Sequence, residues 1–313
     1  MAAPLISAVI CTHNRDQYLG AAIDSLLTQS LDNYEVIVVD NASTDNTAEV
    51  AKARLSNPKV RYIYEGTLGL SVARNTGAEA AKADIVAYLD DDAEASEVWL
   101  AELMAVFEQQ EKVAIAGGKV TLIWPPNATP PSWLSEELSG SLGAYDLGDE
   151  LVYIKNPSLT PRGLNYAVRK SFLSSVGGFD TNLGRKGKNL LSNEEQHLTR
   201  LALQQELQVA YLPKALAAHN VAPARMKQSW FLSRSWWQGI SESYREQASG
   251  RIGPRQLSRG GERFVRGLYK TMKYIHKPDQ CFENLVYTYG QIAYLGSVSR
   301  NLLRRRGSPQ KAT

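Results

Sequence analysis

Residues 5–39 are LISAVICTHNRDQYLGAAIDSLLTQSLDNYEVIVV, in which two short apolar runs flank an amphipathic segment. Leu19, Ile23 and Leu26 recur at helical spacing, whereas the apolar runs on either side have the length of buried strands. The same alternation of strand and helix patterns continues to about residue 120. It predicts an α/β fold with a doubly wound, mainly parallel sheet, which binds ligands at the carboxyl ends of its strands.

The composition is that of a globular chain, with 313 residues of which 43% are hydrophobic and 21% charged. These values exclude a disordered or fibrous protein. No run of uncharged apolar residues is long enough for a membrane-spanning helix, and the first apolar run lacks the basic flank of a signal peptide. Because Cys11 and Cys281 are too few for a disulfide framework, we expect a reduced, cytoplasmic protein.

Charge divides the chain into two regions. Residues 1–224 carry 18 basic and 27 acidic side chains, whereas residues 225–313 carry 17 basic and 5 acidic ones. We therefore expect one domain over 1–224, followed by a basic, amphipathic helical region over 225–313. The basic region either faces an anionic partner, such as phosphate or a lipid surface, or is a solvated set of helices.

Polar residues follow three of the expected strands. Thr12–Arg15 follows the first strand, Asp40–Asp45 follows the second, and Asp90–Asp92 follows the strand at 85–89. Because the carboxyl ends of parallel strands meet at one edge of a sheet, we expect these residues to converge. Neither G-x-G-x-x-G nor a P-loop motif occurs, which removes the main support for dinucleotide binding and P-loop chemistry.

The three consecutive aspartates suggest a metal site. In an extended segment alternate residues point the same way, so Asp90 and Asp92 would face one side and Asp91 the other. Two carboxylates together with diphosphate oxygens suit Mg²⁺ or Mn²⁺. The alternative is a solvated acidic turn, and the buried strand in front of the aspartates favours the metal.

The polar motifs, taken in chain order, resemble those of family 2 glycosyltransferases. The matching segments are Val9–Arg15, Val38–Asp45, Gly69–Gly77 and Tyr88–Asp92, and the resemblance extends over about residues 5–220. It implies the GT-A fold and a metal-dependent, inverting hexosyltransferase that takes a sugar from a nucleotide diphosphate sugar, with UDP as the expected nucleotide. The implied acceptor is a glycan or a lipid-linked molecule of cell-surface or extracellular polysaccharide biosynthesis.

The resemblance also implies which residues bind the donor. By position, Asp40 would accept hydrogen bonds from the base, and Arg74 would contact the diphosphate or the ribose. Family members often carry a second acid after Asp40, where this chain has Asn41, so the base is left open. Asp92 would be a metal ligand, with Asp90 directed towards the ribose or the metal. The expected nucleotide-sugar ligands are Thr12, Asn14, Arg15, Asp40, Arg74, Asp90 and Asp91.

Two carboxylates open the helix expected from about residue 193. By the resemblance, Glu195 takes the position of the catalytic base, with Glu in place of the family's Asp, and Glu194 is the alternative. Inversion by direct displacement requires a carboxylate that removes the proton of the acceptor hydroxyl, and a helix N-terminus favours its ionised form. The other interpretation is that both residues only occupy a first helical turn.

His219 follows the strand expected at 209–212. The resemblance implies that it completes the metal shell or contacts the diphosphate, although a lone histidine can also be structural. Charge on the leaving diphosphate must be stabilised, chiefly by the metal as a Lewis acid. Arg225 and Arg234 are candidates to assist it.

Two other functions stay open. A sugar-nucleotide pyrophosphorylase has a related sheet but requires a Gly-rich loop after the first strand, which Thr12–Arg15 does not supply. A non-catalytic module that binds sugar nucleotides or glycans would not need a base. The joint presence of Asp90, Asp92, Glu195 and His219 therefore argues against such a module.

The C-terminal region and two earlier segments remain to be assigned. In the region 260–306, helical spacing predicts one apolar face made of Phe282, Leu285, Val286, Tyr289, Ile292 and Ala293. This face either meets the inner surface of the plasma membrane or packs on the first domain. No nucleic-acid recognition motif is present. The Pro-, Gly- and Ser-rich segments 121–161 and 184–192 are expected to be mobile acceptor loops.

Overall fold

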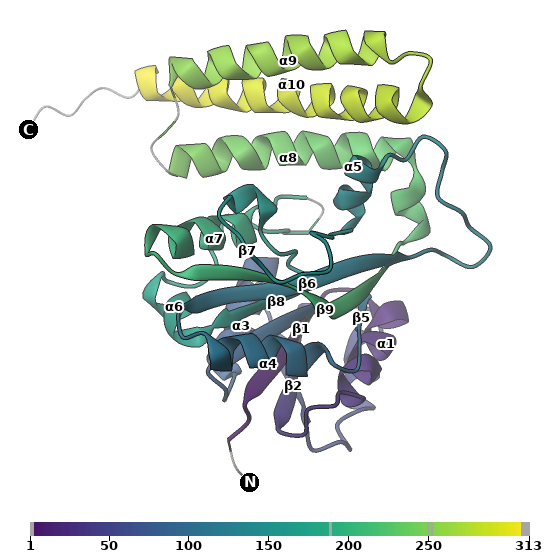
Figure 1. Ribbon diagram of the computed structural model, residues 1–313, viewed down its shortest axis with the longest axis vertical. Coiled ribbons are helices and arrows are strands. Elements are labelled where there is room, and N and C mark those ends of the chain that lie inside the picture. Colours follow the sequence, from purple (N-terminus) through teal and green to yellow (C-terminus); the bar gives the residue numbers. More distant parts are fainter. Residues whose placement is uncertain (1–2, 188–189, 249–250, 252, 308–313) are drawn as a thin grey trace, which may run out of the picture. The chain divides into compact units, whose positions relative to one another are not determined.

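The computed structural model describes residues 3–187, 190–248, 251 and 253–307 (Figure 1). Contacts within the chain define two compact units. The sheet unit comprises Met1–Ile123, Gly143–Gly187 and Glu194–Asn220, and the helical unit comprises Trp124–Leu142, Lys188–Asn193 and Val221–Thr313. The last part of the helical unit thus begins near the boundary predicted after residue 224, and two segments from the middle of the chain join it.

In the described part of the chain, a nine-stranded sheet forms the sheet unit, in the order β3-β2-β1-β4-β8-β6-β9-β5, with β7 paired to β9. β1 is parallel to β2 and β4, and β6 is parallel to β9, whereas β8 is antiparallel to β4 and β6. The predicted mainly parallel sheet is confirmed. The strands are β1 Ile6–Thr12, β2 Tyr34–Asn41, β3 Val60–Glu65, β4 Ile85–Asp90, β5 Ala93–Ala95, β6 Val113–Ile123, β7 Val152–Tyr153, β8 Asn165–Arg169 and β9 Gln208–Asn220.

Amphipathic helices pack on this sheet through their apolar faces. The first helix buries Leu19, Ile23 and Leu26, the residues whose spacing predicts it. The helix α3 (Leu70–Ala80) lies close to β1 because Gly77 has no side chain, and a Cβ there would collide with Val9. The helices of the unit are α1 Asp16–Leu27, α2 Thr47–Lys52, α3 Leu70–Ala80, α4 Trp99–Gln109, α6 Lys170–Ser175 and α7 Glu194–Gln204.

β9 is longer than the pattern predicts. The strand expected over 209–212 has 13 residues in the structure, so His219 lies within the strand and does not follow it. The register of β9 with β6 shifts after Gly118, where a Cβ would collide with the β9 backbone. Pro213 lies in this bulge, which absorbs the residues that cannot pair. Because Pro213 interrupts the apolar run, the sequence pattern predicts only the first half of β9.

The segment 121–161 was expected to be one long loop, and this is wrong. Proline and glycine separate several short elements there, each too short for a periodic pattern to reveal. They are the end of β6, α5 Glu136–Ser139, β7, and 3₁₀ turns at Gly140–Leu142 and Pro157–Leu159. In the segment 184–192, residues 188 and 189 lie outside the described residues, and the mobility of both segments stays a prediction.

Three long helices form most of the helical unit, namely α8 Gln228–Ala248, α9 Pro254–Lys273 and α10 Pro278–Gly307. Figure 1 shows them lying alongside one another. α10 packs closely on α8 because Gly290 has no side chain. A Cβ at this position would collide with Ser235. Trp133 places its ring 5.3 Å from that of Phe231 and 4.9 Å from that of Phe282. Within the described residues, no helix is long and apolar enough to cross a bilayer.

The single apolar face predicted for 260–306 is split in the structure. Phe282, Val286 and Ala293 are buried, whereas Leu285, Tyr289 and Ile292 are 42%, 37% and 44% exposed. The two sets lie on neighbouring sides of α10. Residues three or four apart are neighbours on a helix surface, but they do not fall on one straight line along it. The first set packs inside the helical unit, and of the second set Tyr289 places its ring 5.3 Å from that of Trp236 on α8.

Candidate active site

The ends of β1, β2 and β4 meet at one edge of the sheet, as their polar residues predict. In register, Thr12 pairs with Asp40, and Cys11 pairs with Asp90. A pocket opens at this edge. Its walls include Thr12, His13, Arg15, Asn41, Asp90, Asp91 and Asp92 at the strand ends, and Gly69 and Arg185 on neighbouring loops.

Buried acidic side chains form one wall of this pocket. Oδ1 of Asp92 lies 3.1 Å from Nε2 of His219, which the pairing of β5 with β9 places opposite Ala93. Arg15 lies 3.9 Å from both Asp91 and Asp92. Burial, and next the charge of Asp92, raise the pKa of Asp91 to about 7. A cation bound at this wall would stabilise the ionised carboxylates.

The side chains present suit a divalent cation that is shared with a substrate. Among the residues that the structure describes, no group of three acidic, histidine or cysteine side chains is arranged to hold a metal by itself. Mg²⁺ in particular takes one or two carboxylates and completes its octahedron with phosphate oxygens and water. Asp92 and Asp90 fit that pattern, and His219 beside Asp92 offers a nitrogen as a further candidate ligand. The role of these three residues as ligands stays a prediction.

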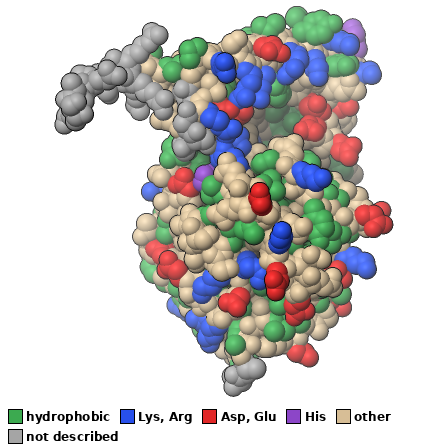
Figure 2. Space-filling view, turned by 60° about the vertical axis from the view of Figure 1, so that its left-hand side comes forward, with side chains coloured by type: hydrophobic (Ala, Val, Ile, Leu, Met, Phe, Trp, Pro, Cys, Tyr) green, Lys and Arg blue, Asp and Glu red, His purple; other side chains and the backbone are tan. Residues whose placement is uncertain are grey.

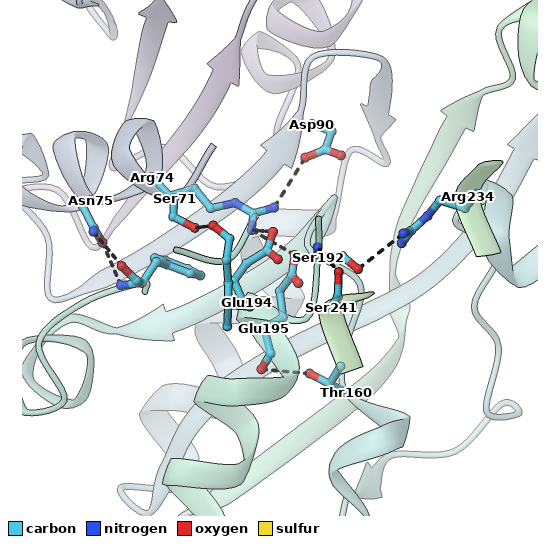
Figure 3. A network of polar contacts seen from close by, with 12 residues as sticks. Ser71, Arg74, Asn75, Asp90, Thr160, Ser192, Glu194, Glu195, Arg234 and Ser241 are labelled. Atoms are coloured by element: carbon cyan, nitrogen blue, oxygen red, sulfur yellow. Dashed lines mark hydrogen bonds and ion pairs between the residues drawn. The ribbon is translucent and has the colours of Figure 1, made fainter. Parts of the chain in front are cut away.

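Arg74 on α3 connects this acidic wall to the start of α7 (Figure 3). Its Nη1 donates to Oε1 of Glu195 at 2.9 Å and to Oε1 of Glu194 at 3.1 Å, and its Nη2 lies 3.8 Å from Asp90. The side chain is only 3% exposed. Burial opposes its charge, but Glu195, Glu194 and Asp90 more than offset this and raise the pKa of Arg74. The resemblance assigns Arg74 to the diphosphate or ribose, whereas in the structure its guanidinium contacts the carboxylates.

The two glutamates of α7 differ in their surroundings. The side chain of Glu194 is 3% exposed and that of Glu195 is 15% exposed. Burial, and next the charge of Glu195, raise the pKa of Glu194 to about 7. Glu195 is therefore the more accessible carboxylate, and Glu194 is the more buried partner of the same Arg74 nitrogen.

Gly163 is a site residue whose role the sequence pattern did not reveal. A Cβ at this position would collide with Oε1 of Glu195 and Nη2 of Arg74. Any side chain here would thus displace the ion pair between them. Its φ is not positive, so no turn requirement marks this glycine, and only the folded chain reveals the close approach.

On the nucleotide side, Asn41 faces the pocket and Asp40 does not. Asp40 accepts a hydrogen bond from the Tyr62 hydroxyl at 2.7 Å and another from the Ser43 amide at 3.0 Å. Asn41 accepts from the Gly69 amide at 2.7 Å and lines the pocket. Neighbouring residues of a strand point to opposite faces, which explains the difference. The role predicted for Asp40 stays untested, but its position holds the end of β2 in place.

Other candidates lie at different distances from the pocket. Thr12 and Arg15 line it. Asn14 connects two loops, because its Oδ1 accepts from the Thr44 amide at 2.8 Å. In the helical unit, Arg225 is buried, and Arg234 donates to the carbonyl of Leu190 at 3.1 Å. Neither of these arginines is shown to assist a leaving group.

Comparison with known proteins identifies the family. The family model for glycosyl transferase family 2 matches residues 7–161. The chain is a family 2 glycosyltransferase. This glycosyltransferase is 28% identical over 243 residues to the glucosyl-dolichyl phosphate glucuronosyltransferase of Haloferax volcanii. The aligned region covers 76% of each of the two chains. It is also 26% identical to glycosyltransferase GlyA of Streptococcus pneumoniae, over 77% of this chain but only 34% of GlyA.

Solved structures support the GT-A fold. The mannosyltransferase PcManGT of Pyrobaculum calidifontis, in complex with GDP-Man and Mn²⁺, has a TM-score of 0.58 at 18% identity. The likeness covers 99% of this chain and 77% of that one. Because the family model and the curated relatives are glycosyltransferases, the alternative of a sugar-nucleotide pyrophosphorylase is set aside, and the enzyme transfers sugar from a nucleotide sugar.

Proposed function

We propose that this family 2 glycosyltransferase is a metal-dependent, inverting enzyme that moves a hexose from a UDP-linked donor to a glycan or lipid-linked acceptor. The observation that supports this most is the buried contact of Arg74 with Glu195 and Asp90, which joins a candidate base to the acidic wall of the pocket. The Haloferax relative is named for glucosyl-dolichyl phosphate, which supports a lipid-linked acceptor. We propose that this acceptor belongs to cell-surface polysaccharide biosynthesis.

In this mechanism the chain's own residues position both reactants. The donor diphosphate lies beside Asp90 and Asp92, where Mn²⁺ or Mg²⁺ bound with His219 would supply Lewis-acid stabilisation of the leaving group. Arg15 adds positive charge at the same wall. Glu195 accepts the proton of the acceptor hydroxyl as that oxygen attacks the anomeric carbon. Arg74 holds the Glu195 carboxylate in place through the hydrogen bond from its Nη1.

Calorimetric titration tests the donor site. UDP, GDP, dTDP and CMP are titrated into the protein with and without Mn²⁺, and then into Asp92→Ala. We expect one nucleotide, UDP, to bind tightly only when Mn²⁺ and Asp92 are both present. Metal-independent binding, or equal binding to Asp92→Ala, would contradict the metal site.

Replacement of Glu195 by Gln tests the assignment of the catalytic base. The same assay distinguishes an enzyme from the remaining alternative, a non-catalytic binding module. Gln has nearly the same shape but cannot accept the proton, so we expect transfer to fall by about 10²–10⁴-fold while UDP affinity changes little. Glu194→Gln is the matched control at the neighbouring position and should lose less activity. Unchanged transfer by Glu195→Gln would overturn the assignment, and the absence of transfer in the wild-type protein would favour a binding module.

We also propose a cytoplasmic location, with peripheral contact between the C-terminal region and the inner face of the plasma membrane. Supporting observations are the absence of a bilayer-spanning helix among the described residues and the basic composition of 225–313.

A further inference from the structure

α9 exposes a row of large apolar side chains. The row is continuous along the helix and its C-terminal turn, because its members are three or four residues apart. In these five side chains the exposed fraction ranges from 44% to 65%. They are Val265, Leu268, Tyr269, Met272 and Ile275, and we call them the apolar row.

The same helix packs in the helical unit through Leu257 and two glycines. A Cβ on Gly260 would collide with Leu295 of α10, and one on Gly267 would collide with Thr288. Both glycines are buried. A helix of a soluble bundle ordinarily turns its large apolar face inward. α9 turns Leu257 inward but leaves the five large side chains of the apolar row exposed, so this row is available to an external partner.

Basic residues form a second row beside the first. Arg266, Lys270, Lys273 and Lys277 are exposed and follow the apolar row at an offset of about one residue. Arg263 and Arg259, which face α8, instead pair with Glu242 and Glu246. Glu262 is the one acidic residue of α9. Figure 2 shows Lys and Arg side chains gathered on the helical unit, with hydrophobic side chains along its upper edge.

We propose that α9 is an interfacial helix that docks the enzyme on an anionic lipid bilayer. The apolar row would enter the boundary between headgroups and acyl chains, and the basic row would contact lipid phosphates. A second copy of the chain would bring two basic rows together, and a soluble polyanion would leave the apolar row in water. An anionic bilayer satisfies both rows. This inference rests on the proposed function in one respect, the peripheral membrane contact of the C-terminal region.

Sedimentation of the full-length protein with lipid vesicles tests the proposal. Vesicles of phosphatidylcholine alone are compared with equal mixtures of phosphatidylcholine and phosphatidylglycerol. We expect binding to the anionic vesicles, weakened by salt. Lys270→Gln with Lys273→Gln should lower the partition coefficient by about tenfold or more, since each basic residue near such a surface contributes about fivefold. Val265→Gln with Met272→Gln should lower it similarly.

Matched controls remove the same charges and apolar groups elsewhere. Lys112→Gln with Lys155→Gln, and Leu55→Gln, alter exposed side chains of the sheet unit and should leave vesicle binding unchanged. Equal binding of the α9 variants and wild type would overturn the proposal. The proposal would also be overturned if the wild-type protein forms a dimer and the variant Val265→Gln with Met272→Gln is a monomer. UDP titration in solution separates these outcomes from a failure of the proposed transfer reaction, because the α9 variants should bind UDP normally.

Discussion

Arg74 lies buried against three carboxylates, and its planar guanidinium contacts two of them through the same nitrogen. Lysine keeps the charge but loses the fork. If Arg74 positions the base, Arg74→Lys should lower kcat at least tenfold and change UDP affinity by much less. If it binds the diphosphate instead, kcat and UDP affinity should fall together. Steady-state kinetics and calorimetry on the same preparation distinguish these two roles.

Arg61 provides the control for that substitution. It forms a 2.7 Å pair with Glu35 in the same unit, away from the pocket. Arg61→Lys should therefore leave kcat within about twofold of wild type, as expected for a pair that contributes only to stability. A loss of kcat equal to that of Arg74→Lys would point to general destabilisation.

Glu194 makes stability depend on pH. Its pKa is raised to about 7 in the folded protein by burial and by the charge of Glu195, against about 4.3 when unfolded. The folded state therefore binds the proton more tightly, and its stabilising contribution is lost as pH rises from about 4.3 through 7. A shift of this size corresponds to an upper limit of about 4 kcal/mol.

Glu194→Gln removes that titration. Urea unfolding between pH 5 and 8 should give the wild type a steeper fall in unfolding free energy than Glu194→Gln, with the window set by the raised pKa. Parallel curves for the two proteins would show that another group titrates in this range. Glu65→Gln is the comparison, because the hydrogen bond from the Thr67 amide lowers the pKa of Glu65. Its effect on stability therefore lies at more acidic pH, and between pH 5 and 8 its curve should run parallel to that of the wild type.

At the scale of elements, the bulge between β6 and β9 positions His219 beside Asp92. A Cβ on Gly118 would collide with backbone atoms of β9, so Gly118→Ala should cost about 1–3 kcal/mol of unfolding free energy, as overpacking does. It should also weaken UDP binding in Mn²⁺. Gly66→Ala, whose Cβ would meet only a Tyr64 ring carbon at 3.6 Å, is the control and should be near neutral. Chemical denaturation measures both.

Local patterns predicted the elements whose period is uninterrupted, such as α1 and β4, and the polar strand ends that meet at the pocket. They failed where distant segments decide the outcome. Arg74 and Glu195 are 121 residues apart, and nothing in either segment predicts their contact. Asn41 faces the pocket only because of the strand's phase, and no spacing argument distinguishes it from Asp40. Pro213 conceals a bulge that depends on the partner strand.

At the scale of the whole molecule, the two compact units should respond to different ligands. The predicted donor ligands belong to the sheet unit, whereas the apolar and basic rows belong to the helical unit. Ligand that binds only the folded state adds RT ln(1 + [L]/Kd) to stability, about 2.7 kcal/mol at a hundredfold excess over Kd. That gain should slow amide hydrogen exchange most in the elements that hold the ligand.

Hydrogen exchange measured by mass spectrometry resolves the two responses in one experiment. UDP with Mn²⁺ should slow exchange in peptides from β1, β2 and β4, and leave α9 unchanged. Anionic vesicles should slow exchange in α9 and leave the strands unchanged. Asp92→Ala should abolish only the first effect, and Lys270→Gln with Lys273→Gln only the second. If either ligand protects both units equally, the donor and lipid sites are coupled, and the separate assignment of the two functions would be wrong.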